Sequence, residues 1–188
     1  MSKVAIGPGP YLYPMPVLLV GANVGDKPNF MAVAWGGIAD SEPPMVTVAI
    51  RHSRYTIKGF SHDAAFSVNI PSRDMVREAD FCGMASGARV DKTARCGFKV
   101  SYGERTGAPL IDQCPLSLEC RVVHSLNLGS HMLFVGRIEE TLVAEDCLTN
   151  GKPDVTKIKP IIFINHPPLY QDYGPVLAKA FNIGKEIS

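Results

Sequence analysis

The hexapeptide from Arg51 to Thr56 (RHSRYT) gathers side chains that could hold an anion. It contains two guanidinium groups and the hydroxyl groups of Ser53 and Thr56, and it follows a strand-like run at the point where a short helix should begin. Guanidinium groups and free backbone N–H groups at a helix start bind phosphate well. The hexapeptide therefore predicts an anion site; the alternative is an ordinary basic turn in solvent.

Two runs with strand-like alternation precede this hexapeptide, at 30–35 and 45–51, and a connection containing Gly36-Gly37 and Pro43-Pro44 joins them. Each run has a bulky apolar face suited to a core and a second face built mainly from small side chains. The faces of the first run are Phe30, Ala32 and Ala34 against Met31, Val33 and Trp35. Those of the second are Val46, Val48 and Ile50 against Met45, Thr47, Ala49 and Arg51. A flat surface beside an anion site suggests a planar phosphorylated ligand such as flavin mononucleotide (FMN); the alternative is a plain hairpin.

The segment NFMAVAWGG, followed by the pattern P-P-x-V-x-V-x-I-R-x-S-R-Y-T, resembles the flavin reductase-like, FMN-binding split-barrel family, in particular its flavoredoxin branch. The resemblance continues through FSVNIP (66–71), FCGMASGARVDK (81–92) and LGSHMLFVGRIEE (128–140), and covers the chain from about Tyr13 to Tyr170. It implies a split β-barrel that forms a homodimer, with FMN held near the subunit interface.

The resemblance also implies which residues bind FMN. Ser53, Arg54 and Thr56, helped by Arg51, are expected to bind the phosphate, and the loop with Ser86, Gly87 and Lys92 to close over it. The strand with Asn29, Met31, Ala32, Val33, Ala34 and Trp35 is expected to lie along the isoalloxazine ring and ribityl chain, mostly through backbone groups that would stabilise the anionic reduced flavin. Because the Trp35 side chain alternates away from Ala32 and Ala34, we interpret it as a core residue.

A histidine near the nicotinamide end is the candidate catalytic residue. In the family it often lies where flavin and nicotinamide meet, so His131 is expected to steer the nicotinamide, to protonate reduced flavin, or simply to pack. His166 and Tyr170 are candidates for lining the cofactor site or a dimer contact. Some flavoredoxin-like sequences carry cysteines after W-G-G-I, where this chain has Ala39-Asp40, so a thiol relay is not expected there. Cys82 is expected to be buried and inert.

Composition sets the broad class. With 188 residues, one domain (1–188) is expected, and a net charge of +1 gives no electrostatic sign of nucleic-acid or membrane binding. The longest apolar run near the N-terminus, 17–20, is too short for a membrane span or signal core, so a cytoplasmic location is predicted. The five cysteines contain no C-x-x-C pair, and neither disulfides nor a metal site are expected.

The chain should be mainly β, a split antiparallel β-barrel with a few short helices. It lacks a βαβ rhythm and a Gly-rich dinucleotide fingerprint. Strands are predicted at 16–23, 30–35, 45–51, 65–70, 116–126, 131–144 and 161–165, with 116–126 and 131–144 forming a hairpin. Short helices are predicted at 55–61, with Ser53 as the cap, and at 74–82. Residues 83–92 should be a loop with a turn of helix, and the C-terminal segment a Pro-rich tail.

The sequence alone does not determine the electron donor. NADH or NADPH could deliver hydride to the flavin, or a redox protein partner could deliver single electrons to a carrier with no turnover of its own. A non-redox binding module on the same barrel is the third interpretation, because a fold does not determine its function.

Overall fold

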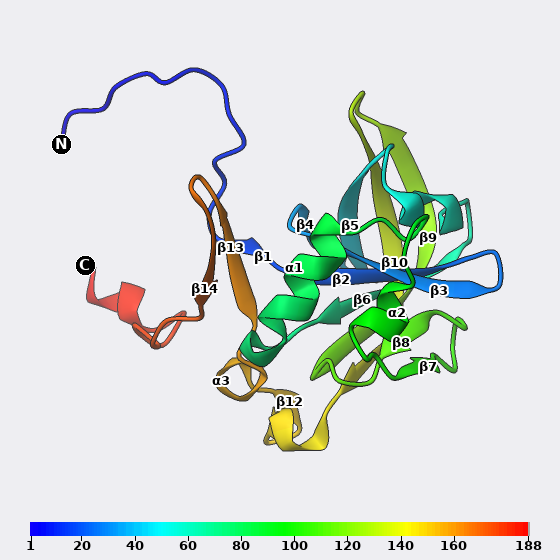
Figure 1. Cartoon of the computed structure of the whole chain (residues 1–188). Helices are drawn as coiled ribbons and strands as arrows, with labels where there is room; N and C mark the ends of the chain where they lie inside the picture. The colour runs from blue at the N-terminus through cyan, green and yellow to red at the C-terminus, as the bar shows by residue number, and fades with distance from the viewer. Residues whose placement is uncertain (188) are drawn as a thin grey trace.

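Seven antiparallel strands form the main sheet, in the order β3-β2-β6-β9-β10-β5-β4. The computed structural model, which describes residues 1–187, shows this sheet rolled into a barrel (Figure 1). The strands are β2 (Leu18–Val24), β3 (Lys27–Val33), β4 (Gly36–Ser41), β5 (Pro44–Arg51), β6 (Ala65–Ile70), β9 (Leu116–Asn127) and β10 (His131–Val143). Every pairing between neighbours is antiparallel.

Smaller elements surround the barrel. A three-stranded sheet contains β1 (Met15–Pro16), β13 (Ile161–Asn165) and β14 (Pro168–Asp172), and two short hairpins pair β7 (Val100–Tyr102) with β8 (Pro109–Ile111) and β11 (Leu148–Thr149) with β12 (Lys152–Pro153). The α-helices are α1 (Val76–Met84), α2 (Lys92–Arg95) and α3 (Val155–Ile158). Single 3₁₀ turns cover Tyr55–Gly59, Arg73–Met75, Glu145–Cys147 and Ile183–Glu186.

Apolar alternation builds two cores, one on each side of β2 and β3. Inside the barrel, Val20 of β2 packs with residues such as Val48 and Phe66. On the outside, Leu19 and Phe30 pack against α1 and neighbouring segments. Phe30 is fully buried, which stabilises the fold by roughly 1.5–3 kcal/mol. Strands β2 and β3 are therefore fixed from both faces, and the position of α1 is fixed with them.

The barrel has a seam, because β3 and β4 are the two ends of the sheet order. The chain crosses from β3 to β4 through Ala34 and Trp35, and the Trp35 carbonyl accepts a hydrogen bond from the Ala49 N–H of β5 (2.8 Å). Beyond Trp35, β4 turns back and pairs with β5. The C-terminal end of β3 is thereby held next to β5 and β10.

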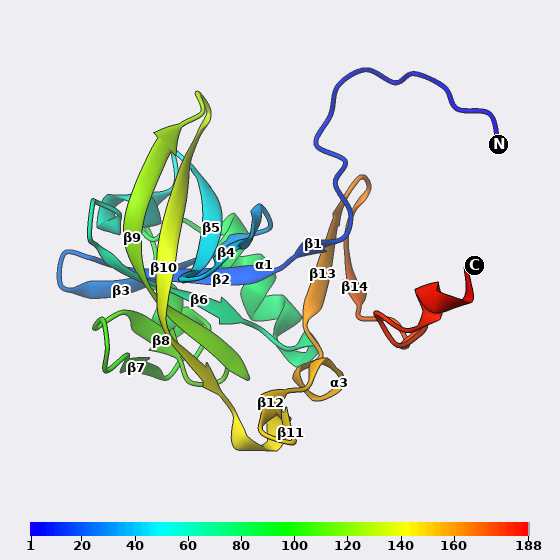
Figure 2. The same ribbon diagram turned by 180° about the vertical axis from the view of Figure 1, so that it is seen from behind.

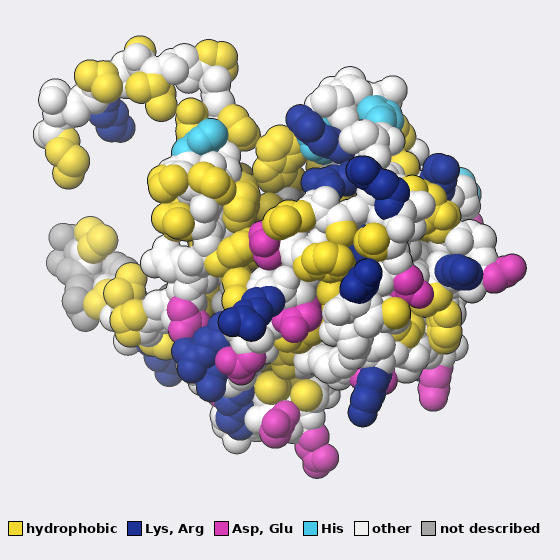
Figure 3. Space-filling view, viewed as in Figure 1, with side chains coloured by type: hydrophobic (Ala, Val, Ile, Leu, Met, Phe, Trp, Pro, Cys, Tyr) yellow, Lys and Arg dark blue, Asp and Glu magenta, His cyan; other side chains and the backbone are white. Residues whose placement is uncertain are grey.

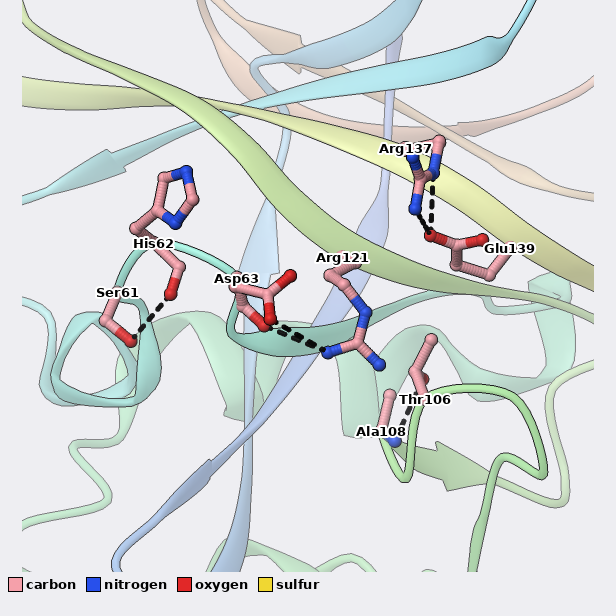
Figure 4. Close-up of polar contacts among 8 residues, drawn as sticks. All are labelled: Ser61, His62, Asp63, Thr106, Ala108, Arg121, Arg137 and Glu139. Carbon is pink, nitrogen blue, oxygen red and sulfur yellow. Dashed lines mark hydrogen bonds and ion pairs between the residues drawn. The ribbon is translucent and has the colours of Figure 1, made fainter.

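The outer polar contacts lie on another part of the barrel (Figure 4). Arg121 of β9 donates to the Asp63 carbonyl (3.1 Å) before β6, and Arg137 of β10 pairs with Glu139 on its own strand (2.7 Å). Exposed ion pairs of this kind contribute roughly 0–1 kcal/mol. They lie on the outer surface of the barrel and line none of the pockets described below.

Both terminal segments leave on the side of the β13–β14 hairpin and extend away from the barrel (Figures 1 and 2). Residues 1–14 are exposed throughout, as are residues 173–185. Among residues 1–187, none of the helices has the length and apolar character needed to cross a membrane.

The predicted fold class is confirmed: the chain is mainly β, with antiparallel sheets and a few short helices. The strands predicted at 65–70 and 161–165 have the observed bounds, and the hairpin of β9 and β10 is also confirmed. Three details were wrong. The run 30–35 ends at Val33; the connection after it contains strand β4; and the Pro-rich segment after β13 forms β14.

Candidate functional site

A pocket of about 250 Å³ lies where the end of β5 meets the loop after α1, and we call it the basic pocket. Its lining residues are Met31, Arg51, Ser53, Arg54, Tyr55, Thr56, Met84, Ala85, Ser86, Gly87, Arg89 and Lys92. All seven residues predicted from the sequence to surround a phosphate are among them. In Figure 3, Lys and Arg side chains gather on the upper part of the face that carries α1. The pocket combines four cationic side chains with hydroxyl groups, which is the composition of a phosphate site.

Arg54 joins the two walls of this pocket. Its side chain is partly buried, and Nη1 donates a hydrogen bond to the Gly83 carbonyl near the end of α1 (2.7 Å). One side chain therefore fixes the position of the loop and still has further N–H donors to offer a ligand. Ser53 does not cap the following 3₁₀ turn as predicted, because Arg54 takes the cap position without a side-chain cap bond.

Asn29 and Thr56 form a buried contact behind the basic pocket. Asn29 is buried, and its Nδ2 donates to Thr56 Oγ1 (2.6 Å). Asn29 was predicted to lie along the flavin, but it lines neither the basic pocket nor the pocket at the seam. It contacts the loop instead: a Cβ on Gly87 would overlap Asn29 Oδ1, so the loop passes directly against it.

Lys92 is almost completely buried, with 4% of its surface exposed. Its Nζ donates to the carbonyls of Phe30 on β3 and Cys82 on α1, each at 2.9 Å. Burial is the main cause that lowers the pKa of Lys92, and Arg54 adds to it. An ammonium group has three N–H donors, and two are used here. Lys92 therefore ties β3 to α1 at the floor of the basic pocket and has one donor left for a ligand.

A second pocket of about 310 Å³ opens at the barrel seam, and we call it the seam pocket. It is lined by Met31, Ala32, Val33, Ala34, Trp35, Ala49, Arg51, Arg54, His131, Phe163 and Asn165. It shares Met31, Arg51 and Arg54 with the basic pocket, so the two form one continuous groove. The small side chains of Ala32, Ala34 and Ala49 form part of its surface, as the alternation of both strands predicts.

The exposed edge of β3 supplies backbone groups to this groove. Strand β3 pairs only with β2 in its sheet, so its other edge has free N–H and C=O groups. The Phe30 carbonyl on this edge is occupied by Lys92. Residues two apart in an antiparallel strand turn their backbone groups to the same side. The N–H and C=O of Ala32 therefore face the groove and can bind the polar rim of a planar ring.

Trp35 and His131 form the far wall of the seam pocket. Their rings lie 4.7 Å apart with a tilt of 35°, and Ser130 Oγ is 2.8 Å from His131 Nδ1. Burial is the main cause that lowers the pKa of His131, followed by the charges of Arg51 and His52. Because Trp35 is 42% exposed, its interpretation as a core residue was wrong. The alternation on which we based it ends at Val33, before the chain bends.

Two other predicted residues lie outside the groove. Tyr170 lines neither pocket; its hydroxyl donates to Asp80 Oδ1 on α1 (2.9 Å), and its ring lies 5.8 Å from that of Phe163. The His166 ring lies 5.3 Å from the ring of Tyr11 in the N-terminal segment, tilted by 55°. Cys82 is buried as predicted, which raises the pKa of its thiol to about 12 and keeps it protonated at neutral pH. All five cysteines are free thiols.

Sequence reasoning missed several lining residues. Tyr55 and Arg89 lie within the two segments already singled out, and Ala49 had been assigned to the small face of its strand, so each carried a usable signal. Phe163 and Asn165 carried none. They reach the groove only because β13 folds back beside β1, a pairing that spans most of the chain.

The donor set fits a flavin phosphate at one end and a planar ring at the other. The basic pocket offers cations and hydroxyls, and the seam pocket offers small side chains, a free strand edge and the rings of Trp35 and His131. An apolar, concave surface with a few convergent polar groups is the usual form of a cofactor site.

Known proteins share the family and the fold of this chain. Residues 11–170 match the flavin reductase like domain family. The crystal structure of a flavoredoxin from Methanosarcina acetivorans is similar over the whole of both chains, with 39% identity and a TM-score of 0.95. A flavoredoxin of Desulfovibrio vulgaris (Miyazaki F) is 38% identical, with a TM-score of 0.91, and the match covers 97% of this chain and 100% of that one. An NADH-dependent FMN reductase from Streptomyces nodosus subsp. asukaensis is 26% identical over 71% of each chain.

The fold, the groove at its seam and the match over residues 11–170 lead to one assignment: this chain belongs to the flavin reductase-like split-barrel family, and flavoredoxins are among its structural relatives.

Proposed function

We propose that this protein is an FMN-binding oxidoreductase that takes up reducing equivalents from NADH or NADPH and passes them to an acceptor. The observation that carries the proposal is the continuous groove made by the basic pocket and the seam pocket. One end is suited to a phosphate and the other to a planar ring, and a ribityl chain would connect the two. The name of the Streptomyces relative, an NADH-dependent FMN reductase, supports the nicotinamide donor.

Each part of the groove has a distinct role. Arg51, Arg54 and Lys92 neutralise the charge of the phosphate, and Ser53 and Ser86 add hydroxyl donors. The Ala32 backbone binds the polar edge of the ring, and donors in a water-poor site stabilise negative charge there. When bound, FMN supplies the chemistry itself, because it accepts hydride or single electrons and releases them again.

His131 is the candidate for contacting the incoming donor. Its pKa is lowered, so the neutral imidazole predominates at neutral pH and the side chain presents a flat, uncharged ring beside Trp35. A neutral imidazole favours stacking with a nicotinamide, or positioning it, rather than donating a proton. We propose that His131 steers the donor, and that the contact with Ser130 holds its ring in place.

The decisive experiment is a visible absorption spectrum of the purified protein with FMN, recorded before and after anaerobic addition of NADH or NADPH. We expect bound flavin whose bands bleach within seconds. Bound flavin that stays oxidised would favour the second candidate, an electron carrier reduced by a protein donor, to which the flavoredoxin relatives give support. A protein that binds no FMN would contradict both candidates and favour a non-redox binding module.

We further propose a cytoplasmic homodimer. Large apolar side chains are almost fully exposed on the two terminal segments, for example Leu12, Leu177 and Phe181. Trp35, at the mouth of the seam pocket, is also exposed. A second copy of the chain could cover these side chains and shield the flavin ring. Five free thiols suit a reducing compartment.

A further inference from the structure

Another cavity adjoins the seam pocket at Trp35, and we call it the apolar pocket. Its volume is about 440 Å³, and it is lined by Pro10, Leu12, Pro14, Met15, Pro16, Ala34, Trp35, Gly36, Gly37, Thr47, Ala49 and Leu133. It shares Ala34, Trp35 and Ala49 with the seam pocket, and it shares no residue with the basic pocket. The apolar pocket therefore adjoins the end of the groove where we place the flavin ring, away from the phosphate end.

Two parts of the chain that are far apart in sequence form the walls of the apolar pocket. One wall is the N-terminal segment 10–16, which Asn165 of β13 holds in place. The Tyr13 hydroxyl donates to Asn165 Oδ1 (2.7 Å), and Asn165 Nδ2 donates to the Pro10 carbonyl (2.9 Å). The other wall comes from Trp35 and from β4, β5 and β10. The pocket is therefore a cleft between two fixed segments and not an open sheet face.

The lining of the apolar pocket carries no charge. None of its residues, all of which lie in the described part of the chain, has an ionisable side chain. Its one hydroxyl group, that of Thr47, already donates a hydrogen bond to the Gly37 carbonyl (3.1 Å). Because burying an unpaired charge is costly, such a lining rejects phosphates and carboxylates. It favours a flat, uncharged molecule that can lie against the indole ring of Trp35.

We propose that the apolar pocket binds the electron acceptor, an uncharged aromatic compound of the quinone class. The inference rests on the proposed function, because that function places the flavin ring in the seam pocket and requires an acceptor beside it. Quinones have the properties that this lining selects, since they are planar, uncharged, largely apolar and redox-active. In the overall reaction NADH loses a hydride and becomes NAD⁺. The quinone gains the two electrons and the proton of that hydride, together with one proton from solvent, and becomes the hydroquinone.

Gly37 offers a way to fill the apolar pocket without altering the groove. Gly37 lies opposite Thr47 in the pairing of β4 with β5, and residues directly opposite each other point to the same face of a sheet. A Cβ at Gly37 would have no neighbour within 4 Å, so Gly37→Phe can place its ring beside Thr47 in the pocket. Ile38→Phe is the matched control, because Ile38 is the next residue of β4, is exposed and lines none of the three pockets.

The test uses 2,3-dimethyl-1,4-naphthoquinone as the probe, because its fully substituted quinone ring does not alkylate cysteine thiols. Equilibrium dialysis against the full-length protein, with and without FMN, measures its Kd. The fluorescence of Trp35, the single tryptophan of the sequence, reports where it binds. We expect saturable quenching of Trp35 with the same Kd and no displacement of FMN. The analogue in which a propionate replaces one methyl group adds a negative charge and should bind at least about tenfold more weakly.

Gly37→Phe should raise the Kd for the probe at least about tenfold and change that for FMN less than about twofold, whereas Ile38→Phe should change neither. The proposal is overturned by a probe that does not bind, that displaces FMN, or that binds wild type and Gly37→Phe equally well. Equal binding of the propionate analogue also overturns it.

A further outcome identifies a different occupant. If the probe does not bind and Gly37→Phe converts a dimer to a monomer in sedimentation velocity, the apolar pocket is a subunit contact and the proposal is overturned. In all these cases FMN that still binds leaves the proposed function standing. If wild type binds no FMN, the proposed function fails, and with it the acceptor role of any quinone that the pocket holds.

Discussion

Arg54 donates to the Gly83 carbonyl and, in the proposed FMN complex, would also bind the phosphate, which makes it the most informative single residue of the groove. Arg54→Ala should weaken FMN binding by roughly 1.5–3 kcal/mol, because it removes a charge-assisted hydrogen bond. This corresponds to an increase in Kd of about 10- to 150-fold. A flavin-fluorescence titration measures it.

Arg77→Ala is the control for that experiment, because Arg77 is exposed on α1 and lines none of the described pockets. Arg54→Lys separates charge from geometry, since lysine keeps the charge but loses the guanidinium fork. If Arg54→Ala binds FMN as tightly as wild type, the basic pocket is not the phosphate site.

His131 allows a prediction about pH. Burial and the neighbouring charges of Arg51 and His52 lower its pKa, so its titration by NMR should have a midpoint below the ordinary value of about 6.5. Arg51→Ala should raise that midpoint, whereas Arg121→Ala, on the outer wall, should leave it unchanged. A midpoint at or above the ordinary value would contradict this description of the seam pocket.

The sign of the effect on stability follows from the same pKa. The folded protein disfavours the charged imidazole, so the unfolded chain binds the proton more readily. Protonation of His131 therefore costs stability as the pH falls below the ordinary pKa of histidine. His131→Asn should reduce that loss of unfolding free energy between pH 8 and pH 5, and denaturant titrations at the two pH values measure it.

At the scale of elements, the loop after α1 is fixed by its contact with β3. A Cβ on Gly87 would overlap Asn29 Oδ1 and come within 2.8 Å of the Tyr55 ring. Gly87→Ala should therefore displace the loop from the basic pocket and raise the Kd for FMN. Gly37→Ala is the matched control, because a Cβ there has no neighbour within 4 Å. Unchanged affinity in Gly87→Ala would show that the loop does not close over the phosphate.

Strand β14 offers a second test at this scale. The Tyr170 hydroxyl bonds Asp80 on α1, and burial, followed by this bond, raises the pKa of Tyr170 to about 12. Tyr170→Phe should lower the unfolding free energy by roughly 1 kcal/mol and leave the Kd for FMN unchanged. Tyr102→Phe, at an exposed residue of β7, should change neither. A marked loss of FMN affinity in Tyr170→Phe would show that Tyr170 does contribute to FMN binding.

How well each element could be predicted depends on how much of the signal for it lies in its own residues. The residues Ile161–Asn165 form an apolar run after a proline, so β13 could be predicted with its observed bounds. Strand β4 consists mainly of small or polar residues and is largely exposed. Strand β14 begins with a proline and is exposed throughout. Neither strand therefore has the alternation that a half-buried strand shows. Trp35 was misassigned for the opposite reason, because an apparent alternation continued past the end of β3.

The site was more predictable at its basic end than at its seam. The residues predicted to bind phosphate occupy two short segments whose composition is distinctive by itself, and all of them line one pocket. The seam pocket is assembled from β3, β5, β10 and β13, and only their tertiary arrangement brings Phe163 and Asn165 to it. Lys92 was identified in the right place, but its burial against the Phe30 and Cys82 carbonyls could not be read from a loop sequence.

At the scale of the whole molecule, the exposed terminal segments predict self-association. Sedimentation velocity should give a species of twice the chain mass of 20.4 kDa. Replacing Leu177 and Phe181 by serine should shift it toward the monomer, because these side chains are 96% and 98% exposed and need a partner surface. Leu142→Ser on β10 serves as the control, and a wild-type monomer at micromolar concentration would contradict the dimer.

The seam has a consequence for how the protein would fare in a cell. The seam pocket exists only when β3, β5 and β10 have come together around Trp35, so the proposed FMN would bind the closed barrel and not the unfolded chain. A ligand of that kind stabilises by RT ln(1 + [L]/Kd), about 2.7 kcal/mol at a hundredfold excess over Kd. Cellular proteases attack chains that open, so the lifetime of this protein should rise and fall with the supply of riboflavin, and its abundance would report the vitamin status of the cell.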